Sequence, residues 1–179
     1  MTVEEIIEDC IIVPSVQHTG MHFLREVLGG RQAKMRFDDL TIRYSEKLPR
    51  PYEIIHGHFD NRTPLLKALS DTRKTVIPLR HPMKVAVSWK KRGAEERRTP
   101  TFLDQWLRMD EFSNAFFFPL EVKPFTALEK YIGRPVIRTT EIYGAQEYDY
   151  PDDVEAFLGG DMFLVELALK TKIGKRFYA

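Results

Sequence analysis

The stretch Val76–Trp89, VIPLRHPMKVAVSW, carries the pattern on which the interpretation of the whole chain depends. It opens with an apolar run typical of a buried strand, which delivers Arg80 at its end. A predicted helix then starts at Pro82, because proline suits the first helical position, and presents Ser88 two turns later. A guanidinium and a hydroxyl placed in this way can bind one phosphate, the first as a bidentate cation and the second as a neutral donor. The same pattern also fits ordinary α/β packing.

The segment Cys10–Leu28, CIIVPSVQHTGMHFLREVL, has a related pattern. A short apolar strand leads into a polar loop with Thr19 and Gly20, and a helix with regularly spaced apolar residues follows. The start of a helix offers unpaired backbone N–H groups and the positive end of the helix dipole, which suit an anion. An ordinary helix cap with a tight turn is the alternative.

These two segments and a third resemble the sulfotransferases that use 3′-phosphoadenosine 5′-phosphosulfate (PAPS). Gln17–Leu28 is similar to the family's first loop, PKSGTTWLxEIL. Arg80–Trp89 resembles the motif RNPKDVAVSxY, with the arginine and the serine in register. His56-Gly57-His58 resembles the KTH or HGH sequence that holds the catalytic base at a strand end. The likeness covers about residues 8–92, and the tail Lys170–Phe177 is distantly similar to the family's RKG loop around the 3′-phosphate.

The resemblance implies both a fold and a reaction. The fold is α/β in three layers, with a central, mostly parallel sheet, helices on both faces and a P-loop-like nucleotide site. The reaction moves a sulfonate group in line from PAPS to a hydroxyl or amine, releases adenosine 3′,5′-bisphosphate (PAP) and requires no metal. The nucleotide-binding residues that it implies are Gln17, His18, Thr19, Gly20, Met21, His22, Arg80 and Ser88.

Three histidines are the expected catalytic residues. His58 is the expected general base, since an imidazole with an ordinary pKa of about 6.5 accepts a hydroxyl proton at neutral pH. His56 stands where many relatives have a lysine near the bridging oxygen, and it either donates a hydrogen bond to the sulfonate or orients the base. His18 stands where the family loop has Lys or Arg, and two nearby phosphates favour its cationic form. We therefore expect nucleotide binding to weaken as the pH rises.

Met21 and His22 replace two hydroxyl residues of the family loop. This difference motivates a second hypothesis, a protein of the same fold that binds PAP or PAPS without turnover. A P-loop kinase is a third hypothesis, which the sequence disfavours because it lacks GxxxxGK[ST] and an evident acidic Mg²⁺ site. Two histidines at alternate strand positions also form half of a metal site, but no Cys or carboxylate cluster accompanies them, so no metal is expected.

Length and composition predict one α/β domain over residues 1–179, because a chain with 43% hydrophobic residues can bury one core but not comfortably two. The lone cysteine, Cys10, forms no internal disulfide, so the fold needs no oxidising compartment. No apolar run approaches the roughly 20 residues of a membrane span, and the acidic N-terminus lacks the features of a secretory signal. A cytoplasmic protein without a membrane partner is expected.

Charge is unevenly distributed along a chain whose net charge is +1. Residues 73–98 contain nine Lys or Arg and two Glu, whereas residues 141–166 contain eight acidic residues and no Lys or Arg. The basic region attracts a polyanionic nucleotide, or it is simply a solvated helix face. Nucleic acid is not an expected partner, because the basic run is short and has no interleaved aromatic residues. Small molecules, glycans and proteins all stay open as acceptors, and the oligomeric state is left open too.

Strand and helix signals alternate along the chain, which predicts a parallel sheet covered by helices. Ligands bind such sheets at the carboxyl ends of the strands, where we expect His18, His58 and Arg80. The expected strands are Cys10–Val13, Tyr52–His56, Thr75–Leu79 and Pro135–Arg138. The expected helices are Gly20–Leu28, Thr63–Leu69, Pro82–Lys91, Thr101–Phe116, Pro124–Tyr131 and Pro151–Leu158.

Overall fold

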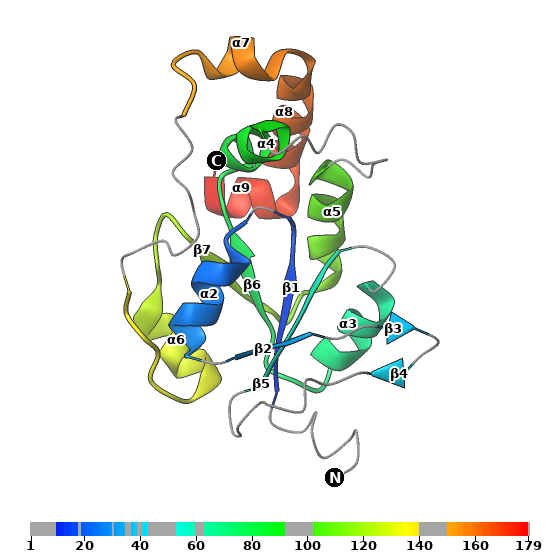
Figure 1. Ribbon diagram of the computed structural model, residues 1–179, viewed down its shortest axis with the longest axis vertical. Coiled ribbons are helices and arrows are strands. Elements are labelled where there is room, and N and C mark those ends of the chain that lie inside the picture. Colours follow the sequence, from blue (N-terminus) through cyan, green and yellow to red (C-terminus); the bar gives the residue numbers. More distant parts are fainter. Residues whose placement is uncertain are drawn as a thin grey trace.

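The parallel strands of the protein form two small sheets that adjoin (Figure 1). The computed structural model describes residues 10–17, 19–29, 31–34, 37–38, 41–42, 53–59, 63–91, 102–139 and 150–178. In the first sheet β5 lies between β1 and β2, and in the second β6 pairs with β7, all in parallel. The bounds are Ile11–Ser15 for β1, Arg31–Lys34 for β2, Glu53–His58 for β5, Val76–Leu79 for β6 and Phe116–Pro119 for β7. A short antiparallel pair, β3 (Phe37–Asp38) and β4 (Thr41–Ile42), is separate from them.

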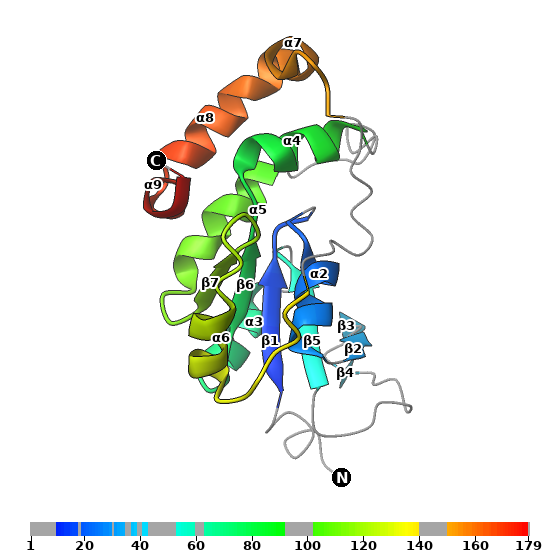
Figure 2. The same ribbon diagram turned by 90° about the vertical axis from the view of Figure 1, so that its left-hand side faces the viewer.

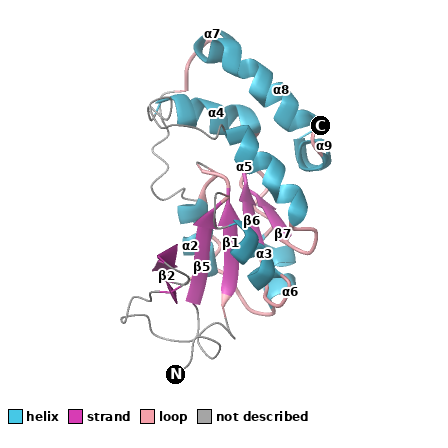
Figure 3. Cartoon of the chain, turned by 90° about the vertical axis from the view of Figure 1, so that its right-hand side faces the viewer, coloured by secondary structure: helices cyan, strands magenta, loops and turns pink. Residues whose placement is uncertain are grey.

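The two parallel sheets meet along β1 and β6. An isolated bridge joins Ile12 to Thr75, and the Ile12 N–H donates to the Lys74 carbonyl at 2.9 Å. Every residue of β1 and β6 is buried, which fits parallel strands whose two faces are both covered. Because β1, β5 and β6 run in parallel, their carboxyl ends lie at a common edge (Figure 3).

Helices cover both faces of these strands (Figure 2). The helices α2 and α6 pack on one face against Ile11, Val13 and Ile54. On the other face α3 and α5 pack against Ile12 and Ile55. Alternate residues of each strand thus face opposite helix layers. The bounds are Met21–Leu28 for α2, Thr63–Ser70 for α3, Phe102–Arg108 for α5 and Phe125–Ile132 for α6.

The remaining helices lie beyond the carboxyl ends of the strands (Figure 3). They are α4 (Pro82–Lys91), α7 (Val154–Leu158), α8 (Met162–Lys170) and α9 (Lys172–Tyr178), with the 3₁₀ turn η3 (Gly159–Asp161) between α7 and α8. A second 3₁₀ turn, η2 (Met109–Glu111), continues α5. The Lys90 ammonium lies 3.9 Å from the Asp161 carboxylate and 3.5 Å from the Leu158 carbonyl. Lys90 of the basic run therefore joins α4 to the segment around η3, and Arg92, Arg97 and Arg98 lie outside the described residues.

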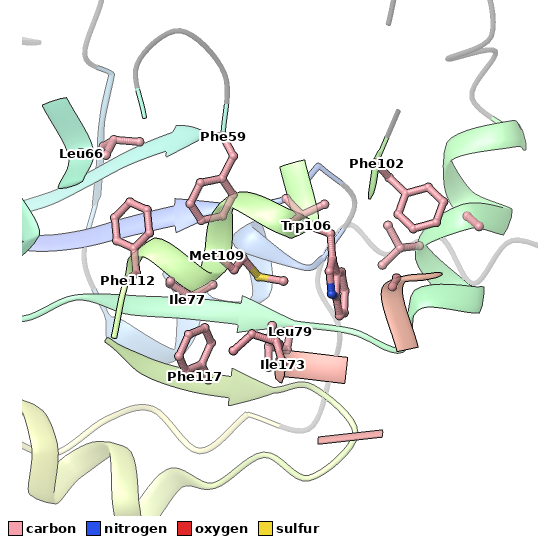
Figure 4. Packing of buried hydrophobic residues seen from close by; sticks show 14 of the residues in the cluster. Phe59, Leu66, Ile77, Leu79, Phe102, Trp106, Met109, Phe112, Phe117 and Ile173 are labelled. Carbon is pink, nitrogen blue, oxygen red and sulfur yellow. The ribbon is translucent and has the colours of Figure 1, made fainter. Parts of the chain in front are cut away.

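A continuous apolar cluster connects the α3 and α5 face to these outer helices (Figure 4). Trp106 is fully buried in it, and its indole N–H donates to Thr171 Oγ1 at 3.0 Å. The same hydroxyl oxygen accepts the Gly174 N–H at 3.1 Å and so caps the start of α9. One threonine thus fixes the corner between α8 and α9 to the core.

The predicted α/β class is confirmed, and most predicted elements are present with shifted ends. Two predictions are wrong. The expected helix Thr101–Phe116 ends early, since α5 and η2 stop at Glu111 and Phe116 begins the buried strand β7. The expected strand Pro135–Arg138 is not a strand, because its backbone turns to the end of α2, where the Ile137 N–H donates to the Val27 carbonyl at 2.8 Å.

The strands β2, β3, β4 and β7 and the helices α8 and α9 were not predicted from the sequence. The tail Lys170–Phe177, compared above with a loop, lies mostly in helix α9. Within the ranges that the structure describes, no helix combines the length and apolar character needed to cross a bilayer.

We predict that Gly174→Ala destabilises the protein. A Cβ at this buried glycine would collide with the Ala168 carbonyl oxygen and lie 2.7 Å from the Leu169 Cα, both backbone atoms that cannot rotate away. The free energy of unfolding should fall by about 1–3 kcal/mol, as for overpacked cores. Urea unfolding measures the change. Gly160→Ala is the matched control, because its Cβ would meet nothing within 4 Å, and an equal loss in both variants contradicts the prediction.

Candidate functional site

The carboxyl ends of β1, β5 and β6 gather several of the predicted site residues at one edge. The β1–β5 register pairs Ser15 with His58. Three residues beyond the bridge between Ile12 and Thr75, Ser15 and Pro78 lie at about the same height in the parallel arrangement. Arg80 follows the end of β6 directly. The sheet therefore brings His58 and Arg80 to the same end, as the sequence analysis expected.

The loop after β1 is held from inside by buried side chains. Thr19 is only 1% exposed, and its hydroxyl donates to the Val16 carbonyl at 2.7 Å. The Gln17 N–H donates at 2.8 Å to Oε1 of Gln105, a buried residue of α5. This backbone N–H is therefore engaged within the protein, so a phosphate contact of Gln17 has to come from its side chain. His18, central to the sequence hypothesis, lies outside the described residues.

Gly20 forms the turn between this loop and α2. Its φ of 92° lies in the left-handed region, which glycine adopts without steric cost. It precedes α2 without a side-chain cap, and its carbonyl accepts the Leu24 N–H at 3.1 Å. At the helix start Met21 is buried and His22 is exposed. An uncapped helix start of this kind has the dipole and N–H groups that favour an anion.

A chain of contacts connects the Gly20 turn to Arg80. Gly20 packs so closely on the side chain of Leu120 that a Cβ would collide with Cδ2. The Leu120 N–H in turn donates to the carbonyl of Leu79 at 2.9 Å, and Arg80 is the next residue. Arg80 is partly exposed. Leu120 thus links the uncapped helix start to the residue before Arg80, although about 60 residues of chain separate Gly20 from Arg80.

Tyr150 belongs to this neighbourhood and was not singled out from the sequence. Burial raises the pKa of its phenol above the ordinary value, and the positive charge of the nearby Arg80 offsets part of this rise. Tyr150 is still 46% exposed. The surface beside Arg80 therefore carries an aromatic side chain as well as a cation.

His56 and His58 lie on the same face of β5, the face that α2 covers. Their rings meet edge to face with centroids 5.4 Å apart. Gly57 between them faces α3, where a Cβ would lie 3.1 Å from Leu66 Cδ1, so the middle position favours glycine. Nδ1 of His58 lies 3.0 Å from Ser15 Oγ. The Nε2 atom of His56 is inaccessible to solvent, which favours orientation of His58 over contact with a sulfonate.

Ser88 is buried in α4, with 4% of its surface exposed. Its helix packs against α5, α7 and α8 beyond the strand ends. Its contact with the same phosphate as Arg80 stays a prediction. Among the residues that the structure describes, no group of three or more His, Cys, Asp or Glu side chains is placed to hold a metal ion.

Glu121 binds the backbone of His81, the residue after Arg80, and was not predicted from the sequence. One carboxylate oxygen accepts the His81 N–H at 2.7 Å, and the other accepts the Tyr178 hydroxyl at 3.2 Å. The His81 and Tyr178 rings meet edge to face at 5.2 Å. Burial and the Glu121 carboxylate both raise the pKa of Tyr178, so its hydroxyl stays a donor. The sequence could have indicated Glu121, because it follows the apolar run that forms β7. Only the tertiary fold brings Tyr178 to it.

We predict that neutral His81 stabilises the fold. Its Nδ1 accepts the Met83 N–H at 3.2 Å at the start of α4, which a protonated Nδ1 cannot do. Burial lowers the pKa of His81 below its ordinary value; Glu121 opposes this shift and Lys84 adds to it. The stabilisation is therefore present above about pH 6.5 and is lost as the pH falls through the lower pKa of the folded state.

The test compares urea unfolding of the native protein and His81→Asn at about pH 8 and about pH 5. Asparagine keeps an acceptor for the Met83 N–H but does not titrate. The native protein should lose more stability on acidification than the variant, and the other histidines cancel in this difference. Identical pH dependence in the two proteins contradicts the prediction.

Comparison with known proteins gives a match at the level of structure. The fold is similar to that of mouse sulfotransferase SULT7A1, solved in complex with PAP, with a TM-score of 0.56 over 98% of this chain and 94% of that chain. The sequence identity is 15%, at which the likeness concerns the fold alone. No protein-family model and no curated protein matches the sequence. The chain therefore has a sulfotransferase-like fold.

Proposed function

We propose that this protein transfers a sulfonate group from PAPS to a hydroxyl or amine of an acceptor. One arrangement supports this most directly: the Gly20 turn, Arg80 and the His58–Ser15 pair lie at the same strand edge. The protein with a similar fold, SULT7A1, was solved with PAP bound. A cation and an uncapped helix start can stabilise the departing phosphate, and an imidazole can accept the proton of the acceptor.

The residues at this edge fit a doubly phosphorylated nucleotide. Arg80 offers a guanidinium, which matches phosphate with two parallel hydrogen bonds. The start of α2 offers backbone N–H groups, and the left-handed Gly20 turn leads into it without a side-chain cap. Ser88 adds a hydroxyl donor, Thr19 supports the loop by donating to the Val16 carbonyl, and His18, His22 and the Gln17 side chain complete the proposed binding set. Met21 is buried, so its contribution is limited to its backbone N–H.

His58 has the role of general base in this proposal. PAPS, when bound, supplies the sulfonate, whose bond from sulfur to the phosphate oxygen breaks as sulfur bonds to the acceptor. His58 accepts the proton that the acceptor hydroxyl or amine loses. Arg80 and the helix start stabilise the negative charge that remains on the departing phosphate. His56 packs edge-on against His58 and holds its ring.

A nucleotide-binding protein without turnover is the second candidate function. The segment between β1 and α2 supports this candidate, because Met21 is buried and the Gln17 N–H already donates to Gln105. Fewer donors then surround the departing phosphate than a loop with two hydroxyl residues offers. PAP affinity without sulfonate transfer is the expected result for this candidate.

We predict that the protein binds PAP without a metal and that Arg80→Ala weakens this binding about 10- to 100-fold, since a charged hydrogen bond contributes about 1.5–3 kcal/mol. Calorimetry with PAP, and with ATP in the presence and absence of Mg²⁺, measures the metal-free affinity for PAP and the effect of the substitution. Arg73→Ala is the control, because Arg73 precedes the opposite end of β6. Preference for ATP with Mg²⁺, or equal losses in the two variants, contradicts the proposal.

We predict that His58→Gln lowers sulfonate transfer by about 10²- to 10⁴-fold, the usual contribution of a general base. The assay follows ³⁵S from labelled PAPS to a panel of phenols, alcohols, sugars and amines. PAP affinity, measured in parallel, should not change, which shows that the variant is folded. Binding without transfer to any acceptor supports the second candidate, and undiminished transfer by the variant excludes His58 as the base.

A further inference from the structure

We infer that Ser15 is a positioning residue for His58: the Nδ1–H of His58 donates to Ser15 Oγ, and Nε2 is the nitrogen that accepts the proton of the acceptor. This inference rests on the proposed role of His58 as general base. It assigns the tautomer of the imidazole, which decides whether the ring can act as a base at all.

The backbone fixes the two side chains opposite each other. Ser15 and His58 are register partners on adjacent parallel strands, and both lie on the α2 face. The Ser15 carbonyl also accepts the Phe59 N–H at 3.1 Å, which continues the strand pairing just past His58. The Oγ to Nδ1 distance of 3.0 Å is that of a hydrogen bond. The pair is therefore set by the sheet and not by a mobile loop.

Burial distinguishes the two ring nitrogens of His58. Ser15 is 0% exposed, so the Nδ1 edge of the ring faces the protein interior. His58 as a whole is partly exposed, and His56 packs edge-on against it. An acceptor substrate can approach the ring only from a side other than that of Ser15. Nε2 lies on the other edge of the imidazole, away from Ser15, and is the nitrogen that we assign to proton transfer.

The direction of the Ser15–His58 hydrogen bond then follows from the chemistry. A neutral imidazole has one N–H and one basic nitrogen. If Ser15 donated to Nδ1, the ring proton would sit on Nε2, and no basic nitrogen would be left facing the acceptor. If Nδ1–H donates to Ser15, Nε2 is basic. The same hydrogen bond persists after Nε2 takes up the proton, so the ring does not need to turn during the reaction.

The first test uses the native protein and no substrate. Two-bond ¹H–¹⁵N correlation spectra of ¹⁵N-histidine-labelled protein, at a pH where the ring is neutral, show which nitrogen carries the proton. The signals of His58 are those that disappear in His58→Gln. A proton on Nδ1 is the expected result. A proton on Nε2 overturns the inference, whether or not the protein transfers sulfonate.

The second test compares Ser15→Ala with Ser15→Thr, which keeps the hydroxyl. In Ser15→Ala the His58 signals should shift toward a mixture of tautomers, and kcat with ³⁵S-labelled PAPS should fall roughly 3- to 10-fold, as expected for one hydrogen bond. KM and PAP affinity should not change, and Ser15→Thr should restore the tautomer. An unchanged tautomer in Ser15→Ala contradicts the inference. If the native protein does not bind PAP, the proposed function is contradicted, but the tautomer measurement still tests the inference.

Discussion

The parallel pairing of β1 with β5, and its bridge to β6, is the constraint on which the site depends. Parallel strands of similar register end at the same edge, so residues far apart in sequence become neighbours. Ser15 meets His58 because their strands are paired, and Arg80 emerges nearby because β6 adjoins β1. The buried apolar residues of both faces hold this register, because a shift by one residue would turn them toward the wrong helix layer.

Buried polar groups of the protein fix the loop that follows β1. Gln105 binds the Gln17 N–H, the Thr19 hydroxyl binds the Val16 carbonyl, and Leu120 fills the space beside Gly20. These internal contacts restrain Gln17, Thr19 and Gly20 before any ligand arrives, which lowers the entropic cost of binding. The same contacts leave fewer donors for phosphate, so Arg80 and the start of α2 carry a larger share of the proposed anion site.

The C-terminal helix contributes to the same region from the other side. Tyr178 reaches Glu121, which also binds the His81 backbone, so the end of α9 is attached to the residue next to Arg80. Thr171 and Trp106 attach the start of α9 to the core. Both ends of this helix are thus fixed by hydrogen bonds to residues of β-strand ends and α5, and α9 stabilises the region around Arg80 without being part of the proposed chemistry.

The sequence by itself determined the α/β class, the strands β1, β5 and β6, the helix starting at Pro82, and the likeness of three segments to a sulfotransferase. These features are local, because apolar runs, proline and helical spacing act within a few residues. Only the tertiary structure decided that Phe116 begins a strand, that 135–138 packs on α2, and that Ser15 faces His58. Pairings of this kind depend on strand register and on burial between distant segments, and no residue pattern within one segment encodes them.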